Sequence, residues 1–308
     1  MSQPFLHNMY VRHERLVKKL LSMFIWSYSA REKMKMMLAY PNGIREFRKK
    51  TRELTTADKK PQKFKHFISI VAIVRDEALN FPEWIEYHKI IGIDKFYIYD
   101  NESTDNTREI LQPYIDAGIV EYIYFPGEKM QTVAYNHFLT HFKNETQWAT
   151  TIDLDEFIVS KQEPFVSFLR KQNPNIAQIL VQWVFFGSNG HIKRPAGLVI
   201  ENYTKRAARP RMHKSIFNPR LTLCCNVHKH IVVGKTINPN MNDIMINHYF
   251  CKSWQDFEKR ASRGDAYRGH EFAAKTFNRA KFDQHDKNDV YDPFILQYVD
   301  RVKKNLNK

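Results

Sequence analysis

Two aspartates separated by one residue, Asp153 and Asp155, follow an apolar stretch that runs from Trp148 to Ile152. In an extended chain the side chains alternate between two faces, so residues i and i+2 point the same way. Both carboxylates can therefore converge on one hard divalent cation, and a cation with so few protein ligands usually shares a diphosphate. The pair predicts a site for a metal and a diphosphate, although two acids at an exposed strand end would give the same pattern.

The residues before this pair alternate between strand and helix patterns. We expect strands at residues 66–74, 95–99, 119–125 and 148–152, and helices at residues 81–92, 107–112 and 132–141. The first helix has an early proline and a terminal glycine, and Pro113 is expected to cut the second one short. This alternation predicts an α/β fold with a mostly parallel sheet, whose ligands bind beyond the carboxyl ends of the strands.

Polar side chains occur at three of these strand ends. Arg75 and Glu77 follow the first strand, and we expect them to close the ligand crevice, unless they are ordinary surface charges. Asp100 ends the second strand, where it can accept a hydrogen bond from a nucleoside hydroxyl or base N–H. The alternative for Asp100 is an acid that stabilises the N-terminus of the next helix.

Short strings spread over about residues 66–270 carry a family resemblance when they are taken together. They are Val74 to Ala78, Trp84 to His88, Tyr99 to Asp105, Gln131 with Tyr135-Asn136, Asp153 to Phe157, Trp183 with Phe186-Gly187, His213 to Ile216, Asn247 to Tyr249, and Lys252-Ser253. In combination they resemble glycosyltransferase family 92 and its bacterial relatives of the family 2 type. The resemblance implies a type A glycosyltransferase fold flanked by helices, a nucleotide-sugar donor, a Mn²⁺ or Mg²⁺ ion, and inversion at the sugar carbon. It also implies substrate contacts from Gln131, Asn136 and Trp183.

The matched positions have roles that follow from their chemistry. We expect Asp155 to bind the metal, and Asp153 to share the ion or to bind the ribose. His248 can complete the metal site as a neutral imidazole, or it can be a hydrogen-bonded core residue. Positive charge for the leaving diphosphate is expected from His213, Lys214 and Lys252, for which a solvated surface is the alternative.

An inverting transfer also needs a base that removes the proton of the acceptor hydroxyl. In relatives of this fold an acid often follows a Trp/Gly loop, but the loop from Trp183 to His191 contains no acid. The identity of the base therefore stays open. Glu201 and Asp265 are the two acids that we would test as catalytic residues.

The net charge of +15 is concentrated in the first fifth of the chain. Residues 1–65 hold sixteen Lys/Arg and five Asp/Glu, so only about +4 belongs to the rest. This distribution favours electrostatic docking by an arm, and no nucleic-acid partner is expected. Residues 16–28 place apolar side chains at helical spacing among basic ones, in a segment too short and too charged to span a bilayer. Such a helix suits an anionic membrane surface, or it packs on the body of the enzyme.

Composition sets the domain organisation and the compartment that we expect. A chain of 308 residues with 43% apolar residues can bury a full core. We divide it into a basic, partly helical extension (1–65), a catalytic domain (66–250) and a helical C-terminal segment (251–308). The three cysteines show no framework of paired spacings, which favours a reducing, cytoplasmic location, peripheral on the inner face of a membrane. A zinc site at Cys224, Cys225, His228 and His230 matches no standard spacing, so buried thiols are expected there.

The function expected from these features is transfer of a hexose from a UDP-type donor to the hydroxyl of a glycan or lipid-linked glycan, such as a bacterial surface polysaccharide. A metal-dependent nucleotidyltransferase is one alternative, but residues 74–78 lack the glycine-rich phosphate loop of that class. A nonenzymatic nucleic-acid- or membrane-binding protein is the other. Such a nucleic-acid binder would interleave basic and aromatic residues on the domain itself.

Overall fold

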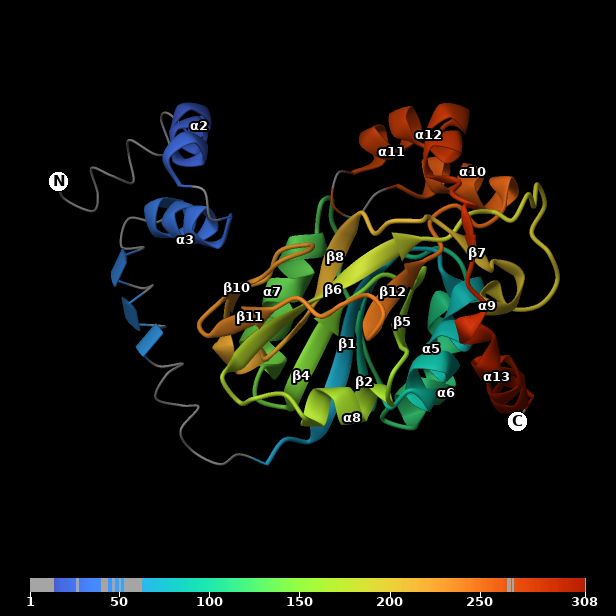
Figure 1. Cartoon of the computed structure of the whole chain (residues 1–308), viewed down its shortest axis with the longest axis horizontal. Helices are drawn as coiled ribbons and strands as arrows, with labels where there is room; N and C mark the ends of the chain where they lie inside the picture. The colour runs from blue at the N-terminus through green and yellow to red at the C-terminus, as the bar shows by residue number, and fades with distance from the viewer. Residues whose placement is uncertain are drawn as a thin grey trace.

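The computed structural model describes residues 14–25, 28–39, 44–45, 48–49, 51–52, 63–264, 267 and 269–307. A twisted central sheet forms the middle of the molecule, helices cover both of its faces, and three C-terminal helices sit over one end of the strands (Figure 1). The sheet has the strand order β3-β2-β1-β4-β8-β6-β12-β5, and β11 pairs with β6 outside this path.

The strands of this sheet are β1 (His66–Val74), β2 (Lys95–Asp100), β3 (Val120–Tyr124), β4 (Thr146–Thr151), β5 (Glu156–Ser160), β6 (Ile176–Phe185), β8 (Met212–Phe217), β11 (Lys235–Ile237) and β12 (Ile244–His248). Neighbours from β3 to β4 are parallel, as are the pairs β6–β12 and β6–β11. Strand β8 runs antiparallel to β4 and β6, and β5 runs antiparallel to β12. The expected α/β fold with a mostly parallel sheet is confirmed. Two small ladders join β7 (Lys205–Arg206) to β13 (Val290–Tyr291), and β9 (Thr222–Cys224) to β10 (Ile231–Val232).

Strand β1 shows how the sequence builds two cores. Ile70 and Ala72 belong to a large cluster with Trp84 of α5 (Phe81–Ile90), whereas Val71 and Ile73 belong to a second cluster on α7 (Gln131–Phe142). Side chains alternate along a strand, so a continuous apolar run supplies both faces of a buried sheet. Helices α5, α6 (Thr107–Asp116) and α13 (Val299–Leu306) lie on one side of the sheet and α7 on the other (Figure 1).

Helix α5 anchors the strand that follows the acid pair. Its Trp84 donates an indole hydrogen bond of 2.9 Å to the carbonyl oxygen of Glu156, and its Tyr87 hydroxyl donates one of 2.7 Å to that of Ile158. The helix ends at Ile90, and Gly92 just beyond it has a φ of +103° and a closeness to Val166 that exclude a side chain. The expected helix therefore holds β5 in place through buried hydrogen bonds.

The expectation for Pro113 is wrong. Helix α6 continues through this residue to Asp116. Proline costs a helix the hydrogen bond to the carbonyl four residues earlier, which here belongs to Glu109. Glu109 is exposed, so water can hydrogen-bond to its carbonyl, and the helix tolerates the loss.

The residues after 250 form two groups of helices. Helices α10 (Trp254–Arg263), α11 (His270–Thr276) and α12 (Arg279–His285) pack through Phe257 and Phe282 at the end of the sheet, and α13 packs on α5 after a turn of 3-10 helix at Phe294–Tyr298. Shorter helices are α8 (Phe165–Arg170) and α9 (Val199–Asn202). Helices α2 (Glu14–Phe24) and α3 (Tyr28–Ala39) lie to one side, away from α10–α12 (Figure 1). None of the helices in the described part of the chain is long and apolar enough to cross a membrane.

Candidate active site

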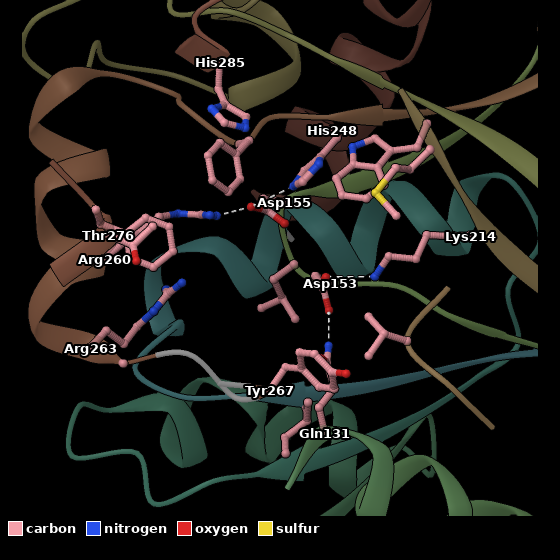
Figure 2. A pocket seen from close by; sticks show the side chains of 18 of the residues that line it. Gln131, Asp153, Asp155, Lys214, His248, Arg260, Arg263, Tyr267, Thr276 and His285 are labelled. Carbon is pink, nitrogen blue, oxygen red and sulfur yellow. Dashed lines mark hydrogen bonds and ion pairs between the residues drawn. The ribbon is translucent and has the colours of Figure 1, made fainter. Parts of the chain in front are cut away.

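A cavity of about 370 Å³ opens at the carboxyl ends of the parallel strands, under α10–α12. Both aspartates of the acid pair, Asp153 and Asp155, point into it (Figure 2). Its other charged or polar walls come from the loop after β1, the start of α7, β8, β12 and the C-terminal helices, and they include Arg75, Glu77, Gln131, Lys214, His248, Arg260, Arg263 and His285. The general rule for α/β sheets, that ligands bind beyond the carboxyl ends of the strands, places the site here.

The acid pair reaches the cavity through a turn. Strand β4 ends at Thr151 and β5 begins at Glu156, and the N–H of Glu156 donates to the carbonyl oxygen of Asp153 at 3.0 Å. The expectation of an extended chain at this point is therefore wrong, because the peptide turns between the two acids. As a result the carboxylates face different partners, Asp153 on one side of the cavity and Asp155 on the other (Figure 2).

Asp155 is the buried member of the pair, with 5% of its surface exposed. Its carboxylate forms an ion pair with Arg260 of α10, and His248 Nε2 lies 3.3 Å from the same oxygen atom. Burial by itself would raise the pKa of Asp155, but the positive charge of Arg260 and the contact with His248 hold that pKa well below its ordinary value. Asp155 therefore stays ionised throughout the physiological pH range.

His248 ends β12 directly beside Asp155. Burial lowers the pKa of the imidazole, although the Asp155 carboxylate acts in the opposite direction. Its Nδ1 atom is buried and has no hydrogen-bond partner among the described residues. The Asp155 carboxylate favours a proton on Nε2 in this state, and a cation bound to Asp155 would instead meet the lone pair of a deprotonated Nε2.

Asp153 is held by two groups from the body of the enzyme. Lys214 Nζ lies 2.8 Å from one carboxylate oxygen, and Gln131 Nε2 donates to the other at 3.4 Å. Lys214 is only 1% exposed and also contacts the fully buried Glu156 at 3.2 Å. Burial would lower the pKa of Lys214, but the two carboxylates raise it, so the ammonium is a fixed internal charge.

Several residues predicted from the sequence lie in this cavity. Gln131, Lys214 and Trp183 line it together with the acid pair and His248. Arg75 and Glu77 line it as well: Arg75 pairs with Glu102 at 2.8 Å and Glu77 pairs with Arg263 of α10. The buried indole Nε1 of Trp183 has no hydrogen-bond partner within the described part of the chain.

Other predicted residues lie outside the cavity lining. Asp100 accepts hydrogen bonds from the Ser103 N–H, at 2.9 Å, and from the Tyr122 hydroxyl, so it holds the turn after β2 rather than the N-terminus of α6. Asn136 forms two hydrogen bonds of 2.9 Å with the backbone N–H and carbonyl of Cys225. Because both side chains are occupied by structural hydrogen bonds, the structure gives neither a position from which to touch a ligand in this cavity.

The remaining predicted residues fall into three different places. His213 is half-buried and does not line the cavity, while Lys252 lines a neighbouring one. Glu201 lies on α9, where it pairs with Lys303 of α13 at 2.7 Å, and it does not line the cavity either. Asp265 lies outside the described residues.

The contribution of the C-terminal helices to the cavity was not predicted. Arg260 and Arg263 stand three residues apart on α10, so both project from one face of the helix into the cavity (Figure 2). That spacing was a usable signal, but nothing local connected it with the acid pair. His285 of α12 was missed too: its Nε2 lies 2.9 Å from Arg211, and burial lowers its pKa to about 4.

Comparison with known proteins identifies the family. The family model of glycosyltransferase family 92 matches residues 66–290, and the chain belongs to this family. It is 30% identical over 208 residues to a family 92 protein of Oryza sativa subsp. japonica, covering 64% of this chain and 35% of that protein. It is 30% identical over 210 residues to one of Ricinus communis, covering 64% of this chain and 38% of that protein. The chain thus spans little more than a third of the length of these relatives.

Solved structures show only a distant likeness to this chain. Staphylococcus aureus TarS (residues 1–349) in complex with UDP is 15% identical, with a TM-score of 0.35, over 50% of this chain and 47% of that one. Glucosyl-3-phosphoglycerate synthase from Mycobacterium tuberculosis, in complex with Mn²⁺, UDP and its product, is 18% identical, with a TM-score of 0.27, over 45% and 49%. Family membership and the sheet topology give this chain the type A glycosyltransferase fold.

Proposed function

We propose that this chain is a metal-dependent, inverting glycosyltransferase that moves a hexose from a UDP-type donor to a hydroxyl of a glycan or lipid-linked glycan. The observation that carries the proposal is the cavity itself, in which Asp153 and Asp155 lie among cationic side chains at the carboxyl ends of the parallel strands. A nucleoside diphosphate is anionic and needs such counter-charge, and a sugar donor of this kind matches the family.

Two side chains of the cavity suit a divalent ion, although no group of three His, Cys, Asp or Glu side chains in the described part of the chain is placed to hold one. Asp155 is an ionised carboxylate that already binds a cation in the form of the Arg260 guanidinium, and the neutral imidazole of His248 faces the same oxygen atom. Oxygen and imidazole nitrogen are suitable ligands for Mn²⁺. We assign Asp155 and His248 as ligands, with Asp153 sharing the ion or binding the ribose. When bound, Mn²⁺ or Mg²⁺ would stabilise the negative charge that develops on the leaving diphosphate.

The chain's own residues divide the remaining work. Lys214 and Gln131 orient the Asp153 carboxylate toward the donor, and Lys214 is too closely held to move. Arg260 and Arg263 offer planar, bidentate donors to the phosphate oxygens at the helix side of the cavity. The unpartnered indole N–H of Trp183 is available to hydrogen-bond a sugar hydroxyl.

The catalytic base belongs to this proposal too. The base must lie within hydrogen-bond reach of the acceptor hydroxyl, which Glu201 does not satisfy because it pairs with Lys303 away from the cavity. We therefore keep Asp265 as the candidate, because Gly264, its neighbour in sequence, lines the cavity. An Asp265→Asn variant that hydrolysed and transferred the donor sugar at the wild-type rate would exclude it.

Helix α2 supports a role at a membrane surface. Its apolar Leu16, Leu20 and Met23 are 55%, 43% and 60% exposed. An exposed apolar stripe on a basic helix suits the interface of an anionic bilayer, and we propose that the enzyme works on the cytoplasmic face of such a membrane. Cosedimentation with vesicles of phosphatidylglycerol and phosphatidylcholine, compared with the chain lacking residues 1–39, tests this point.

The experiment that tests the proposed function is incubation of the purified protein with a panel of nucleotide sugars, with Mn²⁺, with Mg²⁺ or with EDTA. We expect slow hydrolysis of one UDP-sugar that stops in EDTA, and release of a sugar with inverted anomeric configuration, detected by proton NMR. Hydrolysis that continues in EDTA would remove the metal from the proposal, and retention of configuration would remove the inverting mechanism.

A further inference from the structure

A second cavity lies directly beside the active-site cavity. It has a volume of about 380 Å³ and lies between α10 and the loop after β1. The two cavities share three lining residues, Glu77, Arg260 and Arg263, so that a wall of paired charges stands between them. A molecule bound in the second cavity would therefore adjoin a donor bound in the first.

Lys252 is the unusual residue of the second cavity. It is only 7% exposed, and its ammonium forms no hydrogen bond or ion pair with any described residue. Burial is the main cause that lowers its pKa, although Glu77 and Asp155 act in the opposite direction. The backbone at Lys252 also has a φ of +49°, a left-handed conformation that is unfavourable for a non-glycine residue.

Comparison with Lys214 shows what is missing. Both lysines are buried, but Lys214 lies within 3.2 Å of two carboxylates, Asp153 and Glu156. A buried charge normally has such partners, because removing an ion from water is costly. Lys252 lines the second cavity, and no described carboxylate lies at ion-pair distance from it, as expected of a group whose partner is a ligand.

The carboxylates around Lys252 are already engaged by other groups. Glu77 pairs with Arg263, Asp256 pairs with Arg194 at 3.3 Å, and Asp155 pairs with Arg260. The remaining acids of the cavity accept backbone hydrogen bonds, Asp76 from Thr104 and Asp105 from Ala78 and Thr107. These carboxylates neutralise the arginines and cap turns, which leaves the ammonium for an external anion.

The position of Lys252 also indicates which of the two substrates, donor or acceptor, carries the anionic group that it binds. Lys252 does not line the active-site cavity, so the role expected from the sequence, holding the leaving diphosphate, does not match its location. Arg194 and the exposed Lys259 add positive charge to the walls of the same cavity. The second cavity thus suits an anionic group carried by the other substrate of the transfer.

We infer that the second cavity is an acceptor subsite, in which Lys252, with Arg194 and Lys259, binds a phosphate or carboxylate group carried by the acceptor glycan. This inference rests on the proposed function and specifies its acceptor class. In this transfer the acceptor hydroxyl oxygen forms a bond to the anomeric carbon, and its proton passes to the base. The bond from that carbon to the diphosphate breaks, and its electron pair stays on the nucleotide.

The first test measures binding of inorganic phosphate by equilibrium dialysis, with the donor cavity saturated by UDP and Mn²⁺. The proteins are the wild type, Lys252→Met, Lys259→Ala and the control Lys275→Met, whose lysine lies on α11, is exposed and pairs with Glu271. We expect at least about tenfold weaker phosphate binding in Lys252→Met, about threefold weaker binding in Lys259→Ala, and the wild-type affinity in Lys275→Met.

The result that overturns the inference is phosphate binding in Lys252→Met that equals the wild type, or no phosphate binding by the UDP-loaded wild type. Lys259→Ala changes an exposed side chain, so it tests the same subsite if Lys252→Met fails to fold. The proposed function has a separate test. A wild-type protein that does not bind UDP contradicts the donor site, whereas phosphate binding by the same protein bears only on the second cavity.

A second test uses the donor that the hydrolysis panel identifies. Methyl glucoside, glucose 6-phosphate and glucuronate are compared as acceptors, and the last two distinguish phosphate from carboxylate recognition. We expect the preferred anionic acceptor to have a KM at least about tenfold below that of the neutral sugar, and Lys252→Met to remove this difference. Equal KM values for neutral and anionic acceptors in the wild type would contradict the inference.

Discussion

The two aspartates of the active site stand only two residues apart, yet the two sides of the cavity hold them differently. Asp153 faces Lys214, which comes from a central strand, is 1% exposed and is shared with Glu156. Asp155 faces Arg260, which comes from a helix outside the sheet and has a side chain that is 16% exposed. The sheet supplies a permanent internal charge, whereas the helix supplies one that a bound cation and nucleotide can replace.

This comparison implies that the two cations have different tasks. Lys214 lies against the fully buried Glu156 as well as Asp153, so the fold depends on it. Arg260 packs over the Phe250 ring, at 4.6 Å from its centroid, and neutralises Asp155 while no ligand is present. The sheet side should therefore respond to mutation in stability, and the helix side in ligand binding.

The largest effect is expected on the helix side, at Asp155, the proposed metal ligand. Asp155→Asn should lower the rate of metal-dependent donor hydrolysis by about a thousandfold, because loss of the ion removes about 4 kcal/mol of charge stabilisation. The control is Asp283→Asn, which changes an exposed acid paired with Arg279 on α12 and should keep full activity. Wild-type turnover by Asp155→Asn would count against the metal site.

The next effect is a loss of stability on the sheet side. Lys214→Met should lower the free energy of unfolding by about 3 kcal/mol, because it removes the ammonium that pairs with Asp153 and lies 3.2 Å from the fully buried Glu156, whose pKa burial raises well above its ordinary value. Urea unfolding measures the change. Lys303→Met, which breaks the exposed pair with Glu201, is the matched control and should cost less than about 1 kcal/mol. Equal losses in the two variants would break the comparison.

Acid should lower the stability of the fold through two buried histidines before it protonates Asp155. Burial lowers the pKa of His88 and of His230 to about 3, below the ordinary value of 6.5, so each binds a proton more readily when unfolded. The stability that each contributes is complete above pH 6.5 and is lost as the pH falls toward the folded value. Between pH 7 and pH 5, each histidine should lower the free energy of unfolding by about 2 kcal/mol. The lowered pKa of Asp155 acts in the same sense, but its contribution is lost only below about pH 4.

Urea unfolding at pH 7, 6 and 5 checks this prediction. The variant His88→Gln keeps a polar side chain at the same place and should remove about half of the combined loss from the two histidines. A pH-independent unfolding free energy over this range would show that these imidazoles are not held neutral in the fold.

A smaller effect is expected for the exchangeable cation. Arg260→Gln should weaken Mn²⁺-dependent UDP binding by about tenfold, since one charged donor to the diphosphate is lost. Its unfolding free energy should fall less than that of Lys214→Met, because Asp155 borders the cavity and can recruit water or a cation. Calorimetric titration with UDP and urea unfolding measure the two quantities, and a stability loss as large as that of Lys214→Met would remove the distinction.

The smallest effect is expected at Glu201. Glu201→Gln should change stability by less than about 0.5 kcal/mol and leave donor hydrolysis unchanged, because its partner Lys303 is a half-exposed lysine and the pair lies outside the cavity. The hydrolysis assay checks this directly. A loss of activity by several orders of magnitude would restore Glu201 as a candidate for the catalytic base.

The sequence by itself determined the order of strands and helices, because those patterns depend on neighbours in the chain. The apolar run of β1, the proline and glycine of α5 and the acid pair after β4 are all local signals, and the ordered set of short strings carried the family. Local patterns could not separate Asp100 and Asn136, which are engaged in structural hydrogen bonds, from residues that face the cavity.

Only the tertiary structure decided which charges meet. The Arg260–Asp155 pair joins residues 105 positions apart and the Arg263–Glu77 pair joins residues 186 apart, so no window of sequence contains either one. The turn that separates Asp153 from Asp155, and the ammonium of Lys252 that faces a second cavity, likewise follow from packing. An electrostatic partner is chosen by distance in space, and the chain fixes that distance only when it folds.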